Sequence, residues 1–304
     1  MQLGRGGRPL SFGRRAGPPR TRRSPAVRLT GKAVARHPVL VAAFEGWNDA
    51  GESASLAAAF LAGTWGARVV AEIDPEEFFD FTEVRPEVTA SAPRPRSIQW
   101  PVTTISLAHI PGGERDALLL RGHEPSLRWK TYCAAVRDVV SRFGVTEVVT
   151  LGAYLSEITH NRPVPVSAAA SDDAVLDGSR IAASAYEGPT GIVGVLGHEL
   201  AEAGVPTISL WASVPCYSVP VSPKAALALV RACCGLIGAG VVTSELQEQS
   251  EEYERRMDQL VAEDENVAAY VARIEEMEEV VGSDLSAEGL AEEVERFLRE
   301  KRSR

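Results

Sequence analysis

Ionisable and aromatic side chains recur directly after short apolar runs in this sequence. The segments are EGWNDAG at 45–51, RGHEPSLRW at 121–129, LGAYLSE at 151–157, YEGPTG at 186–191 and WASVPCY at 211–217. A few polar groups among aromatic rings are typical of small-molecule pockets. Trp, Tyr and Arg also concentrate where proteins bind one another, so a partner surface is the other interpretation. The candidate residues are Glu45, Trp47, Asn48, Asp49, Arg121, His123, Glu124, Trp129, Glu187, Thr190, Trp211 and Tyr217.

Several of these residues also have simple structural explanations. Asn48 or Asp49 is placed to cap a helix expected over residues 52–64. Glu187, before Gly-Pro, could accept hydrogen bonds from its own turn. The imidazole of His123 is the only one expected in the cleft, whereas His160 and His198 are expected on the surface. Cys216 follows an apolar run without a neighbouring base, which favours a buried, inert thiol.

The sequence lacks the motifs that mark common catalytic sites. It contains no G-x-x-x-x-G-K-[ST] phosphate loop, no G-x-G-x-x-G and no G-x-S-x-G. No His or Cys spacing indicates a metal site, and we expect no cofactor. The YEGPTG loop before a predicted helix could bind an anion through backbone N–H groups, which is a weak signal on its own.

The elements that position the candidate loops alternate between strand and helix patterns. Apolar runs at 38–44, 67–73, 117–120, 146–151 and 207–212 predict buried strands, a further strand is predicted at 180–185, and helices are expected between most of them. Gly191, Gly194 and Gly197 recur at about one turn in the helix expected over 192–203, which predicts close approach of that helix to the sheet. This alternation predicts an α/β fold with a largely parallel sheet and helices on both faces. Parallel strands deliver the loops that follow them to one edge, so the candidate side chains should meet there.

Two segments depart from this alternation. A β-hairpin insertion is predicted, with strands at 96–100 and 102–108. The stretch 152–167 is expected to be loop and hairpin because Pro163 and Pro165 cannot lie in a central ladder.

Charge divides the chain of 304 residues into three parts. Residues 1–36 carry ten Arg or Lys and no acid, so residues 37–304 carry a net charge of −19. We predict a disordered basic extension over 1–36, an α/β core over 37–240 and an acidic helical tail over 241–304. An acidic body argues against nucleic-acid binding. No apolar run is long enough to cross a bilayer, which argues against a membrane protein.

The cysteines and the tail support a cytoplasmic protein with an appended helical unit. Cys133, Cys216, Cys233 and Cys234 show no framework spacing, so reduced thiols in the cytoplasm are expected. Residues 245–304 hold 19 acidic and 8 basic side chains. Three apolar stripes within them, around 253–261, 267–274 and 290–298, have helical spacing and predict helices that dock on the core.

Long motifs in the loops resemble the proteasome assembly chaperone 2 family in its actinobacterial branch. They are AFEGWNDAG at 43–51, AEIDPEEFFDFTEVRP at 71–86, LLLRGHEPSLRW at 118–129, VTLGAYLSEITHNRPVPV at 149–166, SAYEGPTGIVGVL at 184–196 and SLWASVPCYSVPVSPKA at 209–225. The resemblance covers about residues 38–280. It implies a core similar to purine nucleoside phosphorylases and some peptidases, a β-hairpin used in oligomerisation, a C-terminal helical lid over a ligand site, and homotrimers.

Two features differ from what the resemblance implies. Chaperones of this family that act on proteasomes often end in a hydrophobic–Tyr–any motif, whereas this chain ends in Lys301-Arg302-Ser303-Arg304. Cys216 stands where the branch more often has His.

Two functions therefore remain open. The first is a non-enzymatic protein-binding or assembly-chaperone-like factor. The second is an enzyme or small-ligand binder, hydrolase- or phosphorylase-like, that uses the cleft at the sheet edge; a shared fold does not decide between them.

Overall fold

A nine-stranded mixed sheet forms the centre of the computed structural model, which describes residues 26–31, 33–90, 96–172, 176, 181–217 and 220–284. The strands are β1 (Val27–Leu29), β2 (Val39–Glu45), β3 (Arg68–Ile73), β4 (Glu87–Thr89), β5 (Ser97–Gln99), β6 (Thr103–His109), β7 (Asp116–His123), β8 (Glu147–Ser156), β9 (Val166–Ala170), β10 (Ala182–Ala183) and β11 (Thr207–Pro215). The helices are α1 (Ser53–Thr64), α2 (Trp129–Phe143), α3 (Ile192–Glu202), α4 (Pro223–Ile237), α5 (Ser244–Glu263) and α6 (Glu265–Asp284), with a 3-10 turn at Ala50–Glu52.

The middle of the sheet is parallel and its flanks are antiparallel. The strand order is β1-β3-β6-β7-β2-β8-β11-β9-β10. Strands β7, β2, β8 and β11 run parallel, whereas β6 is antiparallel to β7 and β9 is antiparallel to β11. The predicted α/β fold with a largely parallel sheet and helices on both faces is confirmed.

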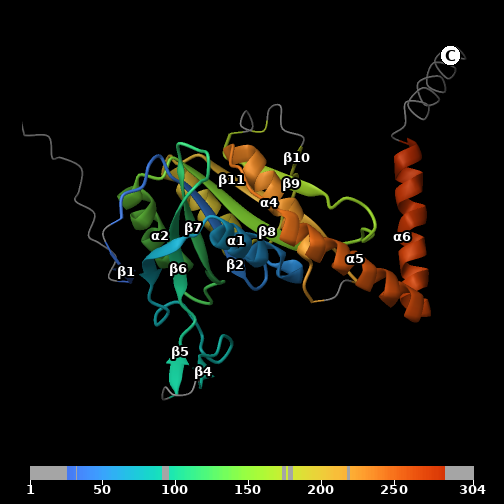
Figure 1. Ribbon diagram of the computed structural model, residues 1–304, viewed down its shortest axis with the longest axis horizontal. Coiled ribbons are helices and arrows are strands. Elements are labelled where there is room, and N and C mark those ends of the chain that lie inside the picture. The colour runs from blue at the N-terminus through green and yellow to red at the C-terminus, as the bar shows by residue number, and fades with distance from the viewer. Residues whose placement is uncertain are drawn as a thin grey trace, which may run out of the picture.

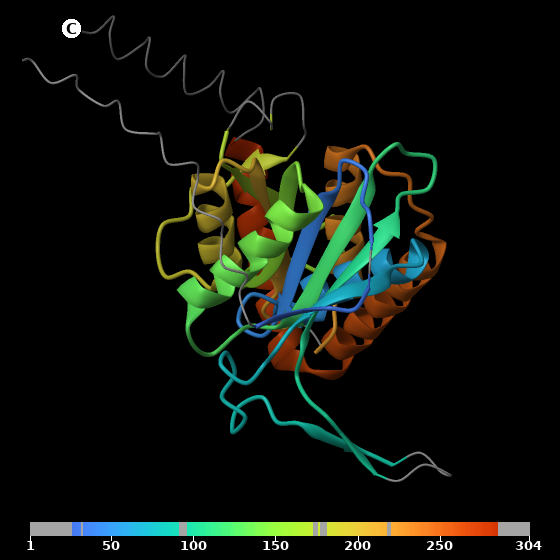
Figure 2. The ribbon, with the colours of Figure 1, turned by 90° about the vertical axis from the view of Figure 1, so that its left-hand side faces the viewer.

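Alternating side chains of the central strands supply two separate cores. On β2, Val39, Val41 and Ala43 face the side covered by α1 and α4. Leu40, Ala42 and Phe44 face the opposite side, covered by α2 and α3. Figure 2 shows these helices on the two sides of the sheet. Because both faces are buried, a continuous apolar run rather than an alternating one encodes this strand.

Two strands are longer than predicted. β7 continues through Arg121 to His123, which we expected in a loop, and β8 continues to Ser156 instead of ending at Leu151. The prediction that all of 152–167 is loop and hairpin is therefore wrong for the first five residues. Gly152 allows β8 to continue because its missing side chain leaves room for the Trp211 ring, which lies 2.6 Å from where a Cβ would stand.

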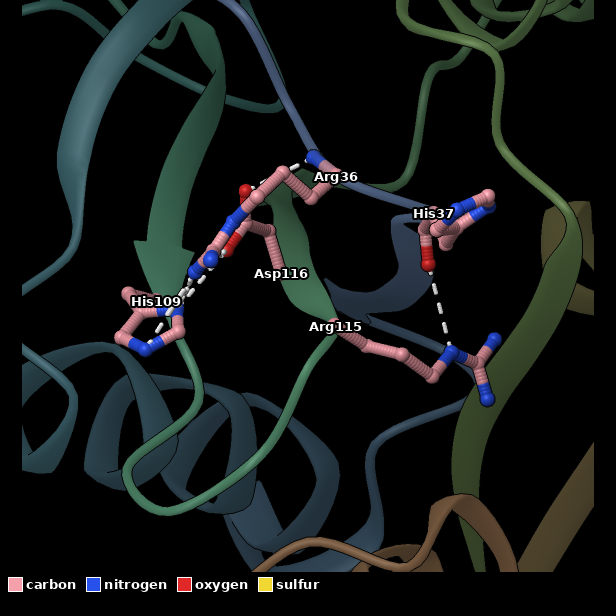
Figure 3. Close-up of polar contacts among 5 residues, drawn as sticks. All are labelled: Arg36, His37, His109, Arg115 and Asp116. Atoms are coloured by element: carbon pink, nitrogen blue, oxygen red, sulfur yellow. Dashed lines mark hydrogen bonds and ion pairs between the residues drawn. The ribbon is translucent and has the colours of Figure 1, made fainter.

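The N-terminal segment contributes an edge strand. β1 pairs antiparallel with β3, so the predicted extension over 1–36 is too long; residues 1–25 lie outside the described residues. Downstream of β1, the Arg36 N–H donates to Asp116 Oδ2 at 2.8 Å, and His109 Nδ1 lies 2.9 Å from Asp116 Oδ1 (Figure 3). Burial raises the pKa of Asp116, but these hydrogen bonds outweigh it, so its pKa lies below the ordinary value.

A two-stranded ribbon projects from the body of the protein, as Figure 1 shows at the β4 and β5 labels. β5 pairs antiparallel with β4, with Val88 opposite Ile98. The predicted pairing of 96–100 with 102–108 is wrong, because β6 instead joins the main sheet between β3 and β7. A hairpin insertion is present, but its first strand comes from residues 87–89.

The tail begins with two long helices. α5 packs on α4, α6 packs on α5, and Leu246 of α5 enters the core shared by α1 and α4. These helices correspond to the first two predicted apolar stripes, and the third, around 290–298, lies outside the described residues. Within the part of the chain that the structure describes, no helix is both long enough and apolar enough to span a bilayer.

Candidate functional site

The loop after β2 is fixed by a buried carboxylate. Asp49 Oδ1 accepts hydrogen bonds from the N–H groups of Ala54 at 2.6 Å and Ser55 at 3.2 Å, in the first turn of α1. Asp49 thus provides the helix cap that the sequence suggested for Asn48 or Asp49. Burial raises the pKa of Asp49 above its ordinary value, against the lowering effect of these hydrogen bonds.

Glu124 connects three elements at the carboxyl edge of the sheet. Its Oε1 accepts from the Asn48 side-chain amide at 2.8 Å and from the Ile192 N–H at 2.7 Å. The second bond satisfies a free N–H at the start of α3, where the helix dipole favours a negative group. Gly191 permits this contact, because a Cβ there would lie 2.4 Å from the Asn48 amide and 2.6 Å from Glu124 Oε1. We call Asn48, Glu124, Gly191 and Ile192 the α3 clamp.

Glu45 and His123 form a pair at the ends of β2 and β7. These strands are parallel neighbours, and Glu45 Oε2 lies 3.0 Å from His123 Nδ1. The hydrogen bond to His123 is the main reason that the pKa of Glu45 is lowered, and the same bond raises the pKa of His123. Both side chains are about half-exposed, so the pair stabilises the fold only weakly.

A cavity of about 980 Å³ opens beside this edge, between α3 and the strands β8, β11 and β9. Trp47, Thr190 and Trp211 are the candidate residues that line it. Tyr154, Tyr186 and His198 also contribute to its walls, and α3 contributes Gly194, Gly197 and Ala201. The cavity lies on the side of the sheet where Ser209 and Trp211 point, away from the α1 and α4 core.

The sequence pattern of the PAC2 family matches residues 43–261, which is more than two thirds of the chain. The chain belongs to the PAC2 family. It is 44% identical to a PAC2 family protein from Streptomyces avermitilis, with a TM-score of 0.72, over 77% of this chain and 99% of that one. It is 42% identical to a proteasome-assembly chaperone homologue from Mycobacterium tuberculosis, with a TM-score of 0.71 and the same coverage. The expected actinobacterial resemblance is confirmed.

More distant structures share the fold of this PAC2 protein. A proteasome activator from the archaeon Pyrococcus furiosus is 20% identical, with a TM-score of 0.61, over 77% of this chain and 97% of that one. This similarity shows the fold alone. No protein of curated function matches the sequence.

The PAC2 structure divides the predicted site into smaller groups. Glu45 and His123 form one pair, and Asn48 and Glu124 belong to the α3 clamp, directly next to Asp49. Arg121 has a buried Nε with no hydrogen-bond partner among the described residues. Trp47, Thr190 and Trp211 line the cavity.

The other three predicted residues lie elsewhere. Trp129 donates its Nε1–H to the Pro125 carbonyl and packs against the α2 core. Glu187 is exposed and does not line the cavity. The argument that placed it at the shared edge is wrong, because β10 is parallel to β9 and therefore runs against β11. The chain lines the cavity with Tyr186 and Thr190 on its way back and meets the α3 clamp at Gly191.

Tyr217 belongs to a contact between the core and the tail. Its hydroxyl accepts from the His160 N–H at 2.9 Å, and its ring meets that of Tyr270 on α6 edge to face, with centroids 6.0 Å apart. His160 Nε2 lies 3.0 Å from Asp258 Oδ1 on α5. His160 is only 4% exposed, so its predicted surface position is wrong: the tail covers it. Cys216 is exposed rather than buried, whereas His198 is exposed as expected.

The cavity residues that sequence reasoning missed carry a recognisable pattern. Thr207, Ser209 and Trp211 alternate along β11 and face the same side, while Gly194, Gly197 and Ala201 recur at helical spacing on α3. The glycine spacing did predict close approach of the helix to the sheet, and a Cβ on Gly197 would lie 3.3 Å from Ser209 Oγ. The sequence did not indicate that the face of β11 with Thr207, Ser209 and Trp211 lies next to these glycines.

We expect the stability that the Glu45–His123 pair contributes to be confined to a window of pH. The Glu45 part is present above its ordinary pKa of 4.5 and is lost as the pH falls through its lowered value. The His123 part is present below its ordinary pKa of 6.5 and is lost as the pH rises through its raised value. Between these limits, His123→Gln should lower the free energy of unfolding by about 0.5 kcal/mol.

Urea denaturation at pH 3, 5.5 and 9 measures this effect. Glu45→Gln should show the same window, and the double variant should lose no more than either single variant at pH 5.5. A coupling between the two substitutions that does not change with pH would contradict the assignment of the pair.

Proposed function

We propose that this PAC2 protein is a non-enzymatic, protein-binding factor that acts in the manner of an assembly chaperone. The observation that carries the proposal is the apolar pair Val88 and Ile98 on the projecting ribbon. The two side chains lie opposite each other across β4 and β5 and are 63% and 59% exposed. Two-stranded ribbons are marginally stable in water, and exposed apolar groups of this kind mark contact surfaces.

The base of the ribbon is held to the body, which leaves the apolar pair presented outward. The Trp100 ring meets Phe81 edge to face, with centroids 4.9 Å apart, although Trp100 remains 50% exposed. A ribbon anchored in this way adds a fixed, protruding edge to which a partner can bind by apolar contact and strand pairing.

The relatives support the assembly-chaperone character, and our proposal adds that the protein is cytoplasmic and homo-oligomeric. The Mycobacterium tuberculosis relative, 42% identical, is a proteasome-assembly chaperone homologue. We propose that the ribbon acts in a homotrimer, as the family resemblance implies, or on a protein partner. The same proposal includes α5 and α6 as a lid over the carboxyl-edge loops, supported by the contacts of Asp258 and Tyr270 with His160 and Tyr217.

A reconstitution experiment tests this function. Purified α and β subunits of an actinobacterial proteasome are mixed with and without the full chain, and the formation of half and complete particles is followed on native gels. We expect the chain to accelerate assembly, and Val88→Asp with Ile98→Asp to abolish the acceleration, because two buried charges at a contact oppose binding.

Matched controls and a mass measurement complete the experiment. Val34→Asp and Val242→Asp change exposed valines elsewhere, 90% and 74% exposed, and should assemble particles like the unchanged protein. Light scattering of the eluting protein should give the mass of a trimer. If the chain does not affect assembly, or if the ribbon variant is as active as the controls, the chaperone function is refuted.

A second function, small-ligand binding, is favoured by the cavity. Trp47, Thr190 and Trp211 would belong to such a site directly, and Glu45, Asn48, Asp49, Arg121, His123 and Glu124 would form its neighbouring edge. Trp129, Glu187 and Tyr217 gain no support as members of it.

A further inference from the structure

The lining of the cavity carries almost no charge. Of all residues in the chain, 24% are Asp, Glu, Lys or Arg, yet none of these types is among the described residues that line the cavity. Among the same described lining residues, His198 carries the only imidazole. A charged ligand group would therefore be desolvated without a counter-charge, which is strongly unfavourable. The composition selects an uncharged occupant.

The two long walls of the cavity are flat because their side chains are small. α3 presents Gly194, Gly197 and Ala201 on one side, and β9 presents Ser167 and Ala169 on the other. α3 and β11 meet at the base of the cavity, because a Cβ on Gly197 would lie 3.3 Å from Ser209 Oγ. Walls without protruding side chains leave a slot, which suits a planar molecule better than a branched or globular one.

Aromatic rings stand around the opening of this slot. Trp47 and Tyr186 are 65% and 67% exposed, and Tyr154 is 44% exposed. Tyr186 is held in place by its hydroxyl, which donates to the Pro189 carbonyl at 2.9 Å. The Trp211 indole rests on Gly152 of the neighbouring strand. Rings fixed in this way lose little freedom when a second π-system packs against them.

Hydroxyl groups supply the polar part of the lining. Ser167 and Thr190 lie on different sides of the cavity, on β9 and in the loop before α3. Each hydroxyl can donate one hydrogen bond and accept others. An aliphatic chain would leave these groups unsatisfied, whereas a ring with heteroatoms at its rim can pair with them.

We propose that the slot between α3 and β9 binds an uncharged, flat heteroaromatic molecule of two or three fused rings. The volume of about 980 Å³ suits a ligand of that size. This inference rests on the ligand-binding function and is independent of the ribbon, so either can fail without the other.

Riboflavin and FMN provide matched probes, because they share one ring system and differ by a phosphate. With the full chain in excess, riboflavin fluorescence should be quenched as the ring packs against the aromatic walls. FMN should bind at least roughly tenfold more weakly, since none of the described residues that line the slot is a Lys or Arg that could pair with its phosphate.

Two substitutions locate the binding. Ala169→Trp places a large ring into the slot from an exposed strand position, which tolerates aromatic residues, and should abolish quenching. Tyr186→Ala should weaken binding about fivefold to tenfold by removing one stacking partner. Ala183→Trp, on the exposed adjacent strand β10 and outside the cavity lining, should bind riboflavin like the unchanged protein.

Several outcomes would overturn the proposal. They are no quenching by riboflavin at millimolar protein, equal affinity for FMN, or equal loss in Ala183→Trp and Ala169→Trp. Thermal melts of each variant show whether binding is lost because the slot is filled or because the protein is unfolded. If riboflavin does not bind, but an apolar peptide binds the unchanged protein and does not bind Ala169→Trp, the occupant is a protein segment. The small-molecule proposal then fails.

Discussion

Gly191→Ala should destabilise the protein by about 2–4 kcal/mol, because it combines overpacking with the loss of buried hydrogen bonds. The new methyl group would stand 2.4 Å from the Asn48 amide and 2.6 Å from Glu124 Oε1. Either the α3 clamp opens or the start of α3 moves away from the sheet. Both responses leave the Ile192 N–H or the Asn48 amide without its acceptor.

The same substitution elsewhere in the chain provides the control. Gly63 lies exposed near the end of α1, and no atom stands within 4 Å of the position that its Cβ would take. Gly63→Ala should stabilise the protein by roughly 0.5–1 kcal/mol, since alanine favours the helix. Urea denaturation of both variants checks the opposite signs. Equal stability of Gly191→Ala and the unchanged protein would show that the clamp is loose.

Leu246→Lys should lower the free energy of unfolding by about 3–5 kcal/mol, because it places a charge where an apolar side chain is buried. Leu246 is fully buried and lies on α5, in the core that α1 and α4 share with the sheet. The melting temperature should fall by roughly 10 °C on the scale of a domain of this size. The variant should also bind more of a dye that detects exposed apolar surface.

Gln249→Lys controls for the added charge. Gln249 lies on the exposed side of the same helix, so its substitution should change stability by less than about 0.5 kcal/mol. If Leu246→Lys melts like Gln249→Lys, then α5 and α6 form a free appendage and not a part of the folded core.

The sequence predicted those elements whose signals are local. The run PVLVAAF is apolar on both faces and predicts a buried strand, and Asn48 or Asp49 is predicted as a cap because the pair precedes a helical pattern. The predictions for the ribbon and for the strand β10 failed for a common reason, because both structures depend on pairing between segments that are distant in the sequence. Residues 97–99 pair with 87–89, and the direction of β10 depends on β9, which no local pattern reveals.

Only part of the candidate site could be predicted, because some of its members are brought together by contacts between segments distant in the sequence. Residues at the ends of neighbouring parallel strands, such as Glu45 and His123, were brought together as expected. Trp47, Thr190 and Trp211 were predicted, but most of the other cavity-lining residues were missed, because many of them are small residues on separate elements that carry no reactive group. Burial of His160 could not be foreseen, since it depends on where the tail docks.

Only one of the four thiols is exposed, so a label on the unaltered protein can report the position of the tail. Burial raises the pKa of Cys133 and of Cys234 to about 12 and that of Cys233 well above its ordinary value, which keeps all three unreactive near neutral pH. Cys216 is exposed and lies next to Tyr270 of α6. A thiol-specific fluorophore would therefore attach where α6 contacts the core, without any engineered residue, and its emission would depend on whether α6 is docked there.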